Sequence, residues 1–237
     1  MDISKLNSEF EKKSPEDVLS WAFKNFSPEI AIASSFGAED VVLIDMAVKI
    51  DPKVSIFTLD TGRLNEETYE VMDRIRSKYK VRIESYFPDY HAVEKLEREK
   101  GFYSFRESVE NRVECCGIRK VEPLNRALKG LKAWVTGLRR DQSVTRSDVL
   151  KIENDTAHGG IFKINPLVDW TNEAVWAYIK KNQVPYNKLH DLGYPSIGCA
   201  PCTRAVKPGE DIRSGRWWWE NPEHKECGLH PPKGPKK

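Results

Sequence analysis

The sequence has no long apolar run and no excess of charge of either sign. No stretch of its 237 residues reaches the roughly 18 consecutive apolar residues that a membrane-spanning helix needs, so we expect no membrane segment. The first residues are polar and lack the apolar core of a signal peptide, which predicts a cytosolic protein. Lysine and arginine number 38 against 36 acidic residues, so we expect no nucleic-acid-binding surface. An anionic ligand must instead be held by a local group of cations.

Internal repeats are absent as well, and cysteine is scarce, with five residues in the chain. Five is an odd number, and structural disulfides are rare in the reducing cytosol. Metal binding or thiol chemistry therefore explains the cysteines better than disulfide bonding does. A hydrophobic fraction of 39% with 31% charged residues is typical of a globular protein with an ordinary core.

Short apolar runs alternate with helical patterns along most of the chain. We predict strands at residues 29–36, 53–59, 82–86 and 133–136, and helices at residues 15–26, 39–50, 65–79, 91–99, 107–128 and 172–181. This alternation favours an α/β fold in which helices cover both faces of a parallel sheet. Proline and glycine become frequent after Pro185, and regular patterns end near Lys207. We therefore predict one α/β domain over residues 1–206 and a flexible tail over residues 207–237.

Three of the turns that follow predicted strands carry groups that suit an anion. In open parallel sheets, ligands bind at the carboxyl ends of the strands. The first turn, Ser34-Ser35-Phe36-Gly37, offers hydroxyls, backbone N–H groups and a helix N-terminus, but it lacks the Lys-Ser/Thr end of a Walker loop. The second turn is Asp60-Thr61-Gly62-Arg63, and the third contains Gly137 and Arg139. Capping or surface salt bridges explain each turn singly, whereas all three together predict an anion site.

Four of the cysteines form two close pairs, Cys115-Cys116 and Cys199-Ala200-Pro201-Cys202. Four thiolates are the number that tetrahedral zinc or a cubic iron–sulfur cluster requires. Adjacent cysteines reach a single small ion awkwardly, whereas a cluster offers separate iron corners, so the pairs favour a cluster without excluding zinc. Buried unpaired cysteines are an alternative, and a thioredoxin-like dithiol is another. The second pair lies in a loop rich in proline and glycine, which fits neither alternative well.

Taken in order, these stretches resemble the assimilatory sulfonucleotide reductases, specifically the cluster-containing adenylyl-sulfate (APS) reductases. The resemblance is carried by Ser34–Asp40, Leu59–Arg63, Cys115–Leu124, Thr136–Ser143, Cys199–Arg204 and Glu226–His230. It implies an adenine nucleotide alpha hydrolase-like fold. It also implies that the protein reduces APS to sulfite and AMP, with thioredoxin as electron donor, in sulfate assimilation and cysteine biosynthesis.

The resemblance further implies roles for single residues. The four paired cysteines, Cys115, Cys116, Cys199 and Cys202, would hold a 4Fe-4S cluster, and Cys227 would be the nucleophile that forms an S-sulfo intermediate. Ser34 to Asp40 would form the loop that faces the phosphosulfate. With the anion-site prediction above, the expected substrate-binding residues are Ser34, Ser35, Phe36, Gly37, Asp60, Thr61, Gly62, Arg63, Gly137 and Arg139. Relatives without the cluster lack both cysteine pairs and use the 3'-phosphorylated substrate PAPS, so APS is expected here, and PAPS or dual specificity is the alternative.

Cys227 is a lone thiol in a polar segment that is broken by prolines. Its implied role as nucleophile explains why this segment keeps a cysteine. A free cysteine with a pKa of about 8.5 is mostly protonated at neutral pH, so we expect cations to assist it. Arg213, Arg216 and His230 are expected to neutralise thiolate and sulfate charge. Lys120 is expected to link cluster and substrate electrostatically, with a solvated structural lysine as the alternative. A second thiol, from reduced thioredoxin, must then release sulfite because no other cysteine is free.

Two other classes of protein are alternative interpretations of this sequence. An enzyme that adenylates its substrate, such as a tRNA-thiolating protein with a cluster, is expected to carry a Ser-Gly-Gly-type pyrophosphate loop, which the first turn is not. A zinc-stabilised binding module predicts colourless protein and a dispensable Cys227. The sequence is also compatible with a homo-oligomer.

Overall fold

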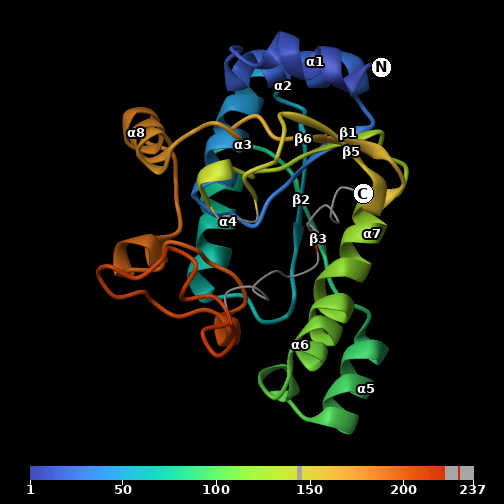
Figure 1. The fold of residues 1–237 in the computed structure, drawn as a ribbon, viewed down its shortest axis with the longest axis vertical. Coiled ribbons are helices and arrows are strands. Elements are labelled where there is room, and N and C mark those ends of the chain that lie inside the picture. Colours follow the sequence, from blue (N-terminus) through green and yellow to red (C-terminus); the bar gives the residue numbers. More distant parts are fainter. Residues whose placement is uncertain (143–145, 222–228, 230–237) are drawn as a thin grey trace. The chain divides into compact units, whose positions relative to one another are not determined.

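The computed structural model describes residues 1–142, 146–221 and 229 (Figure 1). The chain divides into two compact units. The first unit contains Met1–Thr58, Glu67–Glu84 and Gly130–Asn187, and the second contains Leu59–Glu66, Ser85–Lys129 and the described part of Lys188–Lys237. The predicted boundary at residue 206 stays a prediction. Among the described residues, no helix combines the length and the apolar character needed to cross a membrane.

A six-stranded sheet in the order β3-β2-β1-β4-β6-β5 organises the fold. The strands are β1 Ile30–Ala33, β2 Ser55–Leu59, β3 Ile83–Tyr86, β4 Ala133–Val135, β5 Ile152–Asp155 and β6 Ile161–Ile164. β2 and β4 pair in parallel with β1, and β6 pairs in parallel with β4. β5 runs antiparallel to β6 at the edge of the sheet. The sheet is therefore mixed, whereas a parallel sheet was predicted. The β5–β6 hairpin was not predicted at all.

The helices of the first unit are α1 Ile3–Phe10, α2 Pro15–Phe26, α3 Ala38–Ile50, α4 Glu66–Tyr79 and α8 Asn172–Asn182. Four of them, α2, α3, α4 and α8, begin within one residue of their predicted starts, whereas α1 was not predicted. α2 starts with a capping box, in which the Ser14 hydroxyl accepts from the Asp17 N–H at 3.1 Å and Asp17 accepts from the Ser14 N–H at 3.1 Å. α3 is buried on almost every side between residues 38 and 47, because it carries apolar residues around most of its circumference.

Asp45 on α3 connects three helices of the first unit. Its side chain is 3% exposed and accepts hydrogen bonds from the Tyr79 hydroxyl on α4 at 2.8 Å, the Tyr178 hydroxyl on α8 at 2.7 Å and Lys49 Nζ at 2.5 Å. Burial and the neighbouring carboxylate both raise the pKa of the two tyrosines. Three donors thus satisfy one buried carboxylate, and the position of α3 is fixed against α4 and α8.

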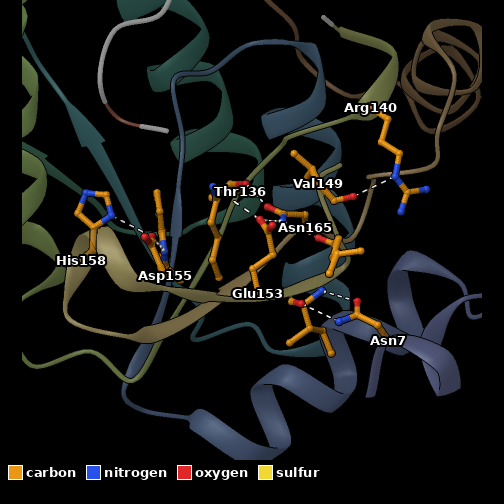
Figure 2. Close-up of polar contacts among 12 residues, drawn as sticks. Asn7, Thr136, Arg140, Val149, Glu153, Asp155, His158 and Asn165 are labelled. Carbon is orange, nitrogen blue, oxygen red and sulfur yellow. Dashed lines mark hydrogen bonds and ion pairs between the residues drawn. The ribbon is translucent and has the colours of Figure 1, made fainter. Parts of the chain in front are cut away.

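A buried polar network ties the β5–β6 hairpin to the end of β4, as Figure 2 shows. The Asn165 side chain is fully buried, accepts from the Thr136 hydroxyl at 2.6 Å and donates to Glu153 Oε2 at 3.0 Å. Asn7 of α1 makes two hydrogen bonds, of 2.8 Å and 3.0 Å, to the backbone of Ile152 in β5. Since Thr136 directly follows β4, this network holds the turn after that strand.

The second unit is built on one long helical segment with a π-helical turn in it (Figure 1). α5 Tyr90–Lys100 and the turn η1 Ser104–Arg106 precede α6 Val109–Cys116, the π-helix η2 Gly117–Val121 and α7 Glu122–Leu128. We predicted an unbroken helix over residues 107–128. The interruption has a local cause, because Pro123 lacks an N–H and its ring would clash with the Arg119 carbonyl in a regular α-helix. A wider π turn relieves that clash.

Candidate functional site

The turn after β1, in the first unit, is held by a buried carboxylate. Ser35 donates its N–H at 2.6 Å and its hydroxyl at 2.8 Å to Oδ2 of Asp40 in the first turn of α3. The Phe36 N–H donates to the Ser34 hydroxyl at 3.1 Å, and Phe36 is fully buried with a φ of 59°. Gly37 is the N-cap of α3 and provides no side-chain cap. A 13-residue helix that begins in this way suits an anion at its N-terminus.

Asp40 makes the stability of this turn depend on pH. Burial raises the pKa of Asp40 from 3.8 to about 6, although the hydrogen bonds from Ser35 oppose the shift. Because the pKa is raised in the folded state, the stabilising contribution of Asp40 is complete below about pH 4 and is lost as the pH rises through about 6. We expect the free energy of unfolding of the wild type to fall by up to about 3 kcal/mol relative to Asp40→Asn between these limits. Urea unfolding of both proteins across this range measures the difference, and parallel pH profiles would contradict it.

The turn after β4 packs directly on the start of α3. A side chain at position 137 would collide with the Asp40 carboxylate and with Cβ of Glu39, so only glycine fits at Gly137. Arg139 is 1% exposed, its Nε and Nη2 lie 2.9 Å and 2.8 Å from Glu39 Oε1, and its Nη1 donates to the Trp170 carbonyl at 3.1 Å. The parallel pairing of β1 with β4 places both turns at one edge of the sheet. Arg139 is engaged by a carboxylate of the same chain, and its contact with substrate stays a prediction.

The turn after β2, the second of the predicted anion-binding turns, belongs to the second unit. The Gly62 N–H donates to Asp60 Oδ1 at 2.9 Å, and Gly62 has a φ of 69°, which favours glycine. Arg63 Nη2 donates to Glu97 Oε1 at 2.9 Å and to the Phe102 carbonyl at 2.9 Å. The turn is therefore ordered by bonds within its own unit.

All four paired cysteines line one pocket of the second unit. Cys115 and Cys116 end α6, and Cys199 and Cys202 lie at the two ends of the short turn η7 Ala200–Cys202. Cys115 is half-buried and the other three are buried, and none of the four is joined to another of them by a disulfide. The structure thus brings together two pairs that lie far apart in the sequence.

Five cationic side chains line the same pocket, namely Arg63, Arg112, Arg119, Lys120 and Arg216. Two carboxylates compensate part of this charge. Glu97 Oε1 lies 2.6 Å from Arg119 Nη2, and Glu220 accepts from Arg112 Nε at 2.8 Å and from Arg112 Nη2 at 2.9 Å. Cations outnumber these carboxylates, so the pocket favours a ligand or cofactor with negative charge.

The thiols respond differently to this environment. Burial raises the pKa of Cys202 to about 12, and burial also raises the pKa of Cys115, against the charges of Arg119 and Arg63. Burial acts in the same direction on Cys199, but the charge of Lys120 and a 3.2 Å hydrogen bond with the Thr61 hydroxyl outweigh it and lower the pKa. Of Cys115, Cys199 and Cys202, Cys199 is the thiol whose pKa is lowered, so the cations favour its thiolate.

The pocket fits a group larger than one metal ion. Within the described ranges, no three His, Cys, Asp or Glu side chains are grouped closely enough to bind a single ion. Trp217 is 1% exposed, and its indole Nε1 has no hydrogen-bond partner among the described residues. Four thiols spread around one pocket, with a buried N–H donor and several cations, suit a larger anionic group.

Arg216 is placed in this pocket by the loop that carries the second cysteine pair. Its side chain is buried, and Nη1 donates to the Ile197 carbonyl at 3.3 Å. A side chain at Gly198 would collide with the Arg216 guanidinium, so Arg216 keeps this position only while glycine stands beside Cys199. The Trp217 N–H donates to the Cys202 carbonyl at 3.2 Å, which fixes the start of the tail on the cysteine loop.

The other predicted catalytic residues are only partly covered by the structure. Lys120 lies in η2 and lines the pocket. Arg213 is half-buried, in a turn where its N–H donates to Asp211 Oδ1 at 2.8 Å. Cys227 and His230 lie outside the described residues, so their roles stay predictions.

Sequence reasoning missed the carboxylates that organise both units. Glu39 and Asp40, in the first turn of α3, bind Arg139 and Ser35, and the sequence does not indicate either contact. Arg112 and Glu220 lie 108 positions apart in the sequence, so no local pattern predicts that they pair. Arg119 was missed as well. The signal that could have identified it is its place in a predicted helix, three residues after Cys116 and next to Lys120.

Comparison with known proteins identifies the family. Residues 29–205, which contain all three turns and both cysteine pairs, match the phosphoadenosine phosphosulfate reductase domain. The chain is 54% identical over 202 residues to the adenosine 5'-phosphosulfate reductase of Burkholderia cepacia, covering 85% of this chain and 80% of that one. It is 51% identical over 234 residues to the enzyme of that name from Pseudomonas aeruginosa strain LESB58, covering 97% and 86%.

Solved structures agree with this result. The phosphoadenylyl-sulfate (PAPS) reductase of Candida auris, solved as a phosphate complex, is similar with a TM-score of 0.74 and 33% identity, covering 86% of this chain and 96% of that one. The predicted fold class is confirmed, apart from the antiparallel edge strand β5. With three quarters of its length matched to one domain, this chain belongs to the phosphoadenosine phosphosulfate reductase family of adenine nucleotide alpha hydrolase-like proteins.

Proposed function

We propose that this protein reduces APS to sulfite and AMP in sulfate assimilation, through an S-sulfo intermediate on Cys227 and with thioredoxin as electron donor. Bacterial relatives at 51% and 54% identity bear the name adenosine 5'-phosphosulfate reductase, and they support APS as the substrate. The observation that carries the proposal is the pocket in which four thiols meet five cations. An anionic cofactor and an anionic substrate both suit that charge.

Cys115, Cys116, Cys199 and Cys202 would hold a 4Fe-4S cluster. The donor set fits, because four thiols line one pocket and four is the number of thiolates that such a cluster takes. When bound, the cluster supplies a fixed, delocalised negative charge around which the neighbouring cations are ordered. The depressed pKa of Cys199 shows that the cations already stabilise sulfur-centred negative charge at that position.

Substrate binding is assigned to the turns at the strand ends. In the first unit, Ser34 to Gly37, Gly137 and Arg139 surround the uncapped N-terminus of α3, where backbone N–H groups and the helix dipole favour a phosphosulfate. In the second unit, the turn of Asp60, Thr61, Gly62 and Arg63 is held by Arg119, which donates to the Thr61 carbonyl at 2.8 Å. The half-buried carboxylate of Glu39 and the buried carboxylate of Asp40 hold the first set in position.

The chemical step is a thiolate attack on the sulfonate sulfur. The Cys227 thiolate forms an S–S bond to that sulfur, the bond from sulfur to the bridging phosphate oxygen breaks, and AMP leaves with the electron pair. Arg213, Arg216 and His230 would neutralise the charge of the thiolate and the sulfonate. Lys120, which lines the cysteine pocket, would extend that positive field toward the substrate.

Release of sulfite needs an external dithiol. A thioredoxin thiolate attacks Sγ of the S-sulfo cysteine, sulfite leaves, and a mixed disulfide remains. The second cysteine of the same thioredoxin, as its thiolate, then attacks the thioredoxin sulfur of the mixed disulfide. The S–S bond to Cys227 breaks, and the Cys227 thiolate is released. Two electrons pass from the dithiol to the sulfonate sulfur, and the thioredoxin ends as a disulfide.

Intact-protein mass spectrometry after anaerobic incubation with APS, without reductant, tests the proposal. We expect the protein to gain the mass of one SO3 group on the peptide that contains Cys227, and Cys227→Ser to gain none while it still binds AMP. No gain in iron-containing wild-type protein, or an adduct in Cys227→Ser, would overturn the assignment. A parallel incubation with PAPS distinguishes APS specificity from dual or PAPS specificity.

A further inference from the structure

An exposed aromatic patch lies on the second unit, beside the cysteine loop and the start of the tail. We define the aromatic patch by four residues, Phe102, Tyr103, Arg106 and Trp218. Phe102 is 65% exposed, Tyr103 58% and Trp218 38%, whereas aromatic side chains of this size are ordinarily buried. Clustered exposed aromatic residues with an arginine are typical of protein–protein contact surfaces.

Arg106 connects the rings of Tyr103 and Trp218, and Phe102 precedes Tyr103 directly in the chain. Its guanidinium carbon lies 5.0 Å from the Tyr103 ring centroid and 5.6 Å from that of Trp218, and also stacks on the deeper rings of Phe105 at 5.8 Å and Trp219 at 5.4 Å. Its Nη2 donates to the carbonyl of Pro201, between the second pair of cysteines, at 3.0 Å. The exposed rings therefore stand on an ordered base, which lowers the entropy lost when a partner binds.

The position of the aromatic patch along the chain indicates its partner. Trp218 precedes Glu220 by two residues, and the buried ion pair of Glu220 with Arg112 anchors the chain at that point. Cys227 follows Glu220 by seven residues, so its sulfur stays within about 25 Å of the anchor even if that segment is fully extended. A dithiol protein of about 100 residues is about 30 Å across, so one that reaches Cys227 is large enough to cover the aromatic patch as well.

We propose that the aromatic patch is the docking surface for the dithiol protein that reduces the S-sulfo Cys227. This inference rests on the proposed function, because it concerns the second half-reaction. Docking on Phe102, Tyr103, Arg106 and Trp218 brings the attacking thiolate within reach of the tethered sulfur without occupying the cysteine pocket. The first half-reaction, in which the adduct forms, does not involve the aromatic patch.

The test separates the two half-reactions. Wild type and a Phe102→Ser/Tyr103→Ser variant are first converted to the S-sulfo form with APS, and sulfite release is then timed with reduced thioredoxin and separately with the small dithiol dithiothreitol. We expect the variant to form the adduct at the wild-type rate and to react with dithiothreitol at the wild-type rate. With thioredoxin at a concentration below saturation, the rate of sulfite release from the variant is expected to fall by about tenfold or more. A loss of this size is typical when interface hot spots are removed.

Phe87→Ser is the matched control. Phe87 is also exposed, at 54%, but its carbonyl accepts from Arg126 in the last turn of α7, whereas η1 packs on the start of α6. The helical segment between these two ends is about 30 Å long. We expect Phe87→Ser to behave as wild type in every assay.

Each other outcome overturns the docking proposal. A folded, iron-containing double variant with unchanged release by thioredoxin would exclude docking at this surface. A change in the dithiothreitol reaction or in adduct formation would mean that the tail itself uses the aromatic patch, and a shift in sedimentation without a change in release would mean that a second copy does. Failure of the wild type to form any adduct would contradict the proposed function, which this design detects before thioredoxin is added.

Discussion

Replacing Glu220 with methionine is expected to destabilise the protein by about 3–5 kcal/mol, because the substitution leaves a buried guanidinium without its counter-charge. The Arg112 and Glu220 side chains are 2% and 4% exposed and form two hydrogen bonds, of 2.8 Å and 2.9 Å. Burial alone lowers the pKa of Arg112, but the hydrogen bond and charge of Glu220 outweigh it and raise the pKa. Urea unfolding at neutral pH measures the loss.

Two further variants make this prediction specific. The double variant Arg112→Met/Glu220→Met removes both charges, so we expect it to be more stable than Glu220→Met. Asp73→Ala breaks the exposed pair with Arg76, whose side chains are 66% and 60% exposed, and it should cost less than about 1 kcal/mol. A Glu220→Met protein as stable as wild type, or a double variant less stable than the single one, would show that the buried pair does not anchor the tail.

Cys199→Ser is expected to abolish iron binding and, with it, turnover by more than about 100-fold, since loss of a ligand exceeds the 10–100-fold cost of losing a second-shell partner. The surrounding cations lower the pKa of Cys199, so its thiolate, the form that binds iron, is favoured. Colorimetric iron content and visible absorbance of freshly prepared anaerobic protein measure the first effect, and sulfite production measures the second.

Cys227→Ser provides the matched cysteine control for that experiment. We expect it to keep its full iron content and its colour while it loses adduct formation, because the proposed cluster ligands are the four pocket thiols Cys115, Cys116, Cys199 and Cys202. Iron retained by Cys199→Ser would contradict the ligand assignment. Colourless wild-type protein that contains zinc would instead favour the binding-module interpretation, in which Cys227 is dispensable.

The central elements of the fold were predictable because their patterns are local. The buried run Ile30-Ala31-Ile32 and the capped start of α2 at Ser14 each identify an element within a few residues. The β5–β6 hairpin escaped prediction because Ile152–Asp155 mixes apolar and polar residues over only four positions, and its place in the sheet depends on Asn7 and Asn165 far along the chain. Tertiary contacts, rather than propensity, decide such strands.

The candidate site also contains some features that the sequence predicts and others that it does not. The cysteine pairs and the three turns were visible as short motifs, and the structure places all four thiols in one pocket. The groups that tune the site were not visible, because each depends on a partner distant in sequence. Arg139 was expected to be available for an anion, yet it is buried and its partner Glu39 lies 100 residues away. Spacing along the chain carries no information about pairs of this kind.

The π-helical turn Gly117–Val121 makes the length of this helical segment as important as its composition. In an α-helix, each residue added or removed rotates everything beyond it by about 100°. The π turn holds one more residue per hydrogen-bonded ring than an α turn, and with that residue in place Cys116 at the end of α6 and Leu124 in α7 are both buried. Deleting a single residue there would turn either the thiol pair or the apolar face of α7 away from the interior. Substitutions at exposed positions of this segment are tolerable, whereas a change in its residue count is not.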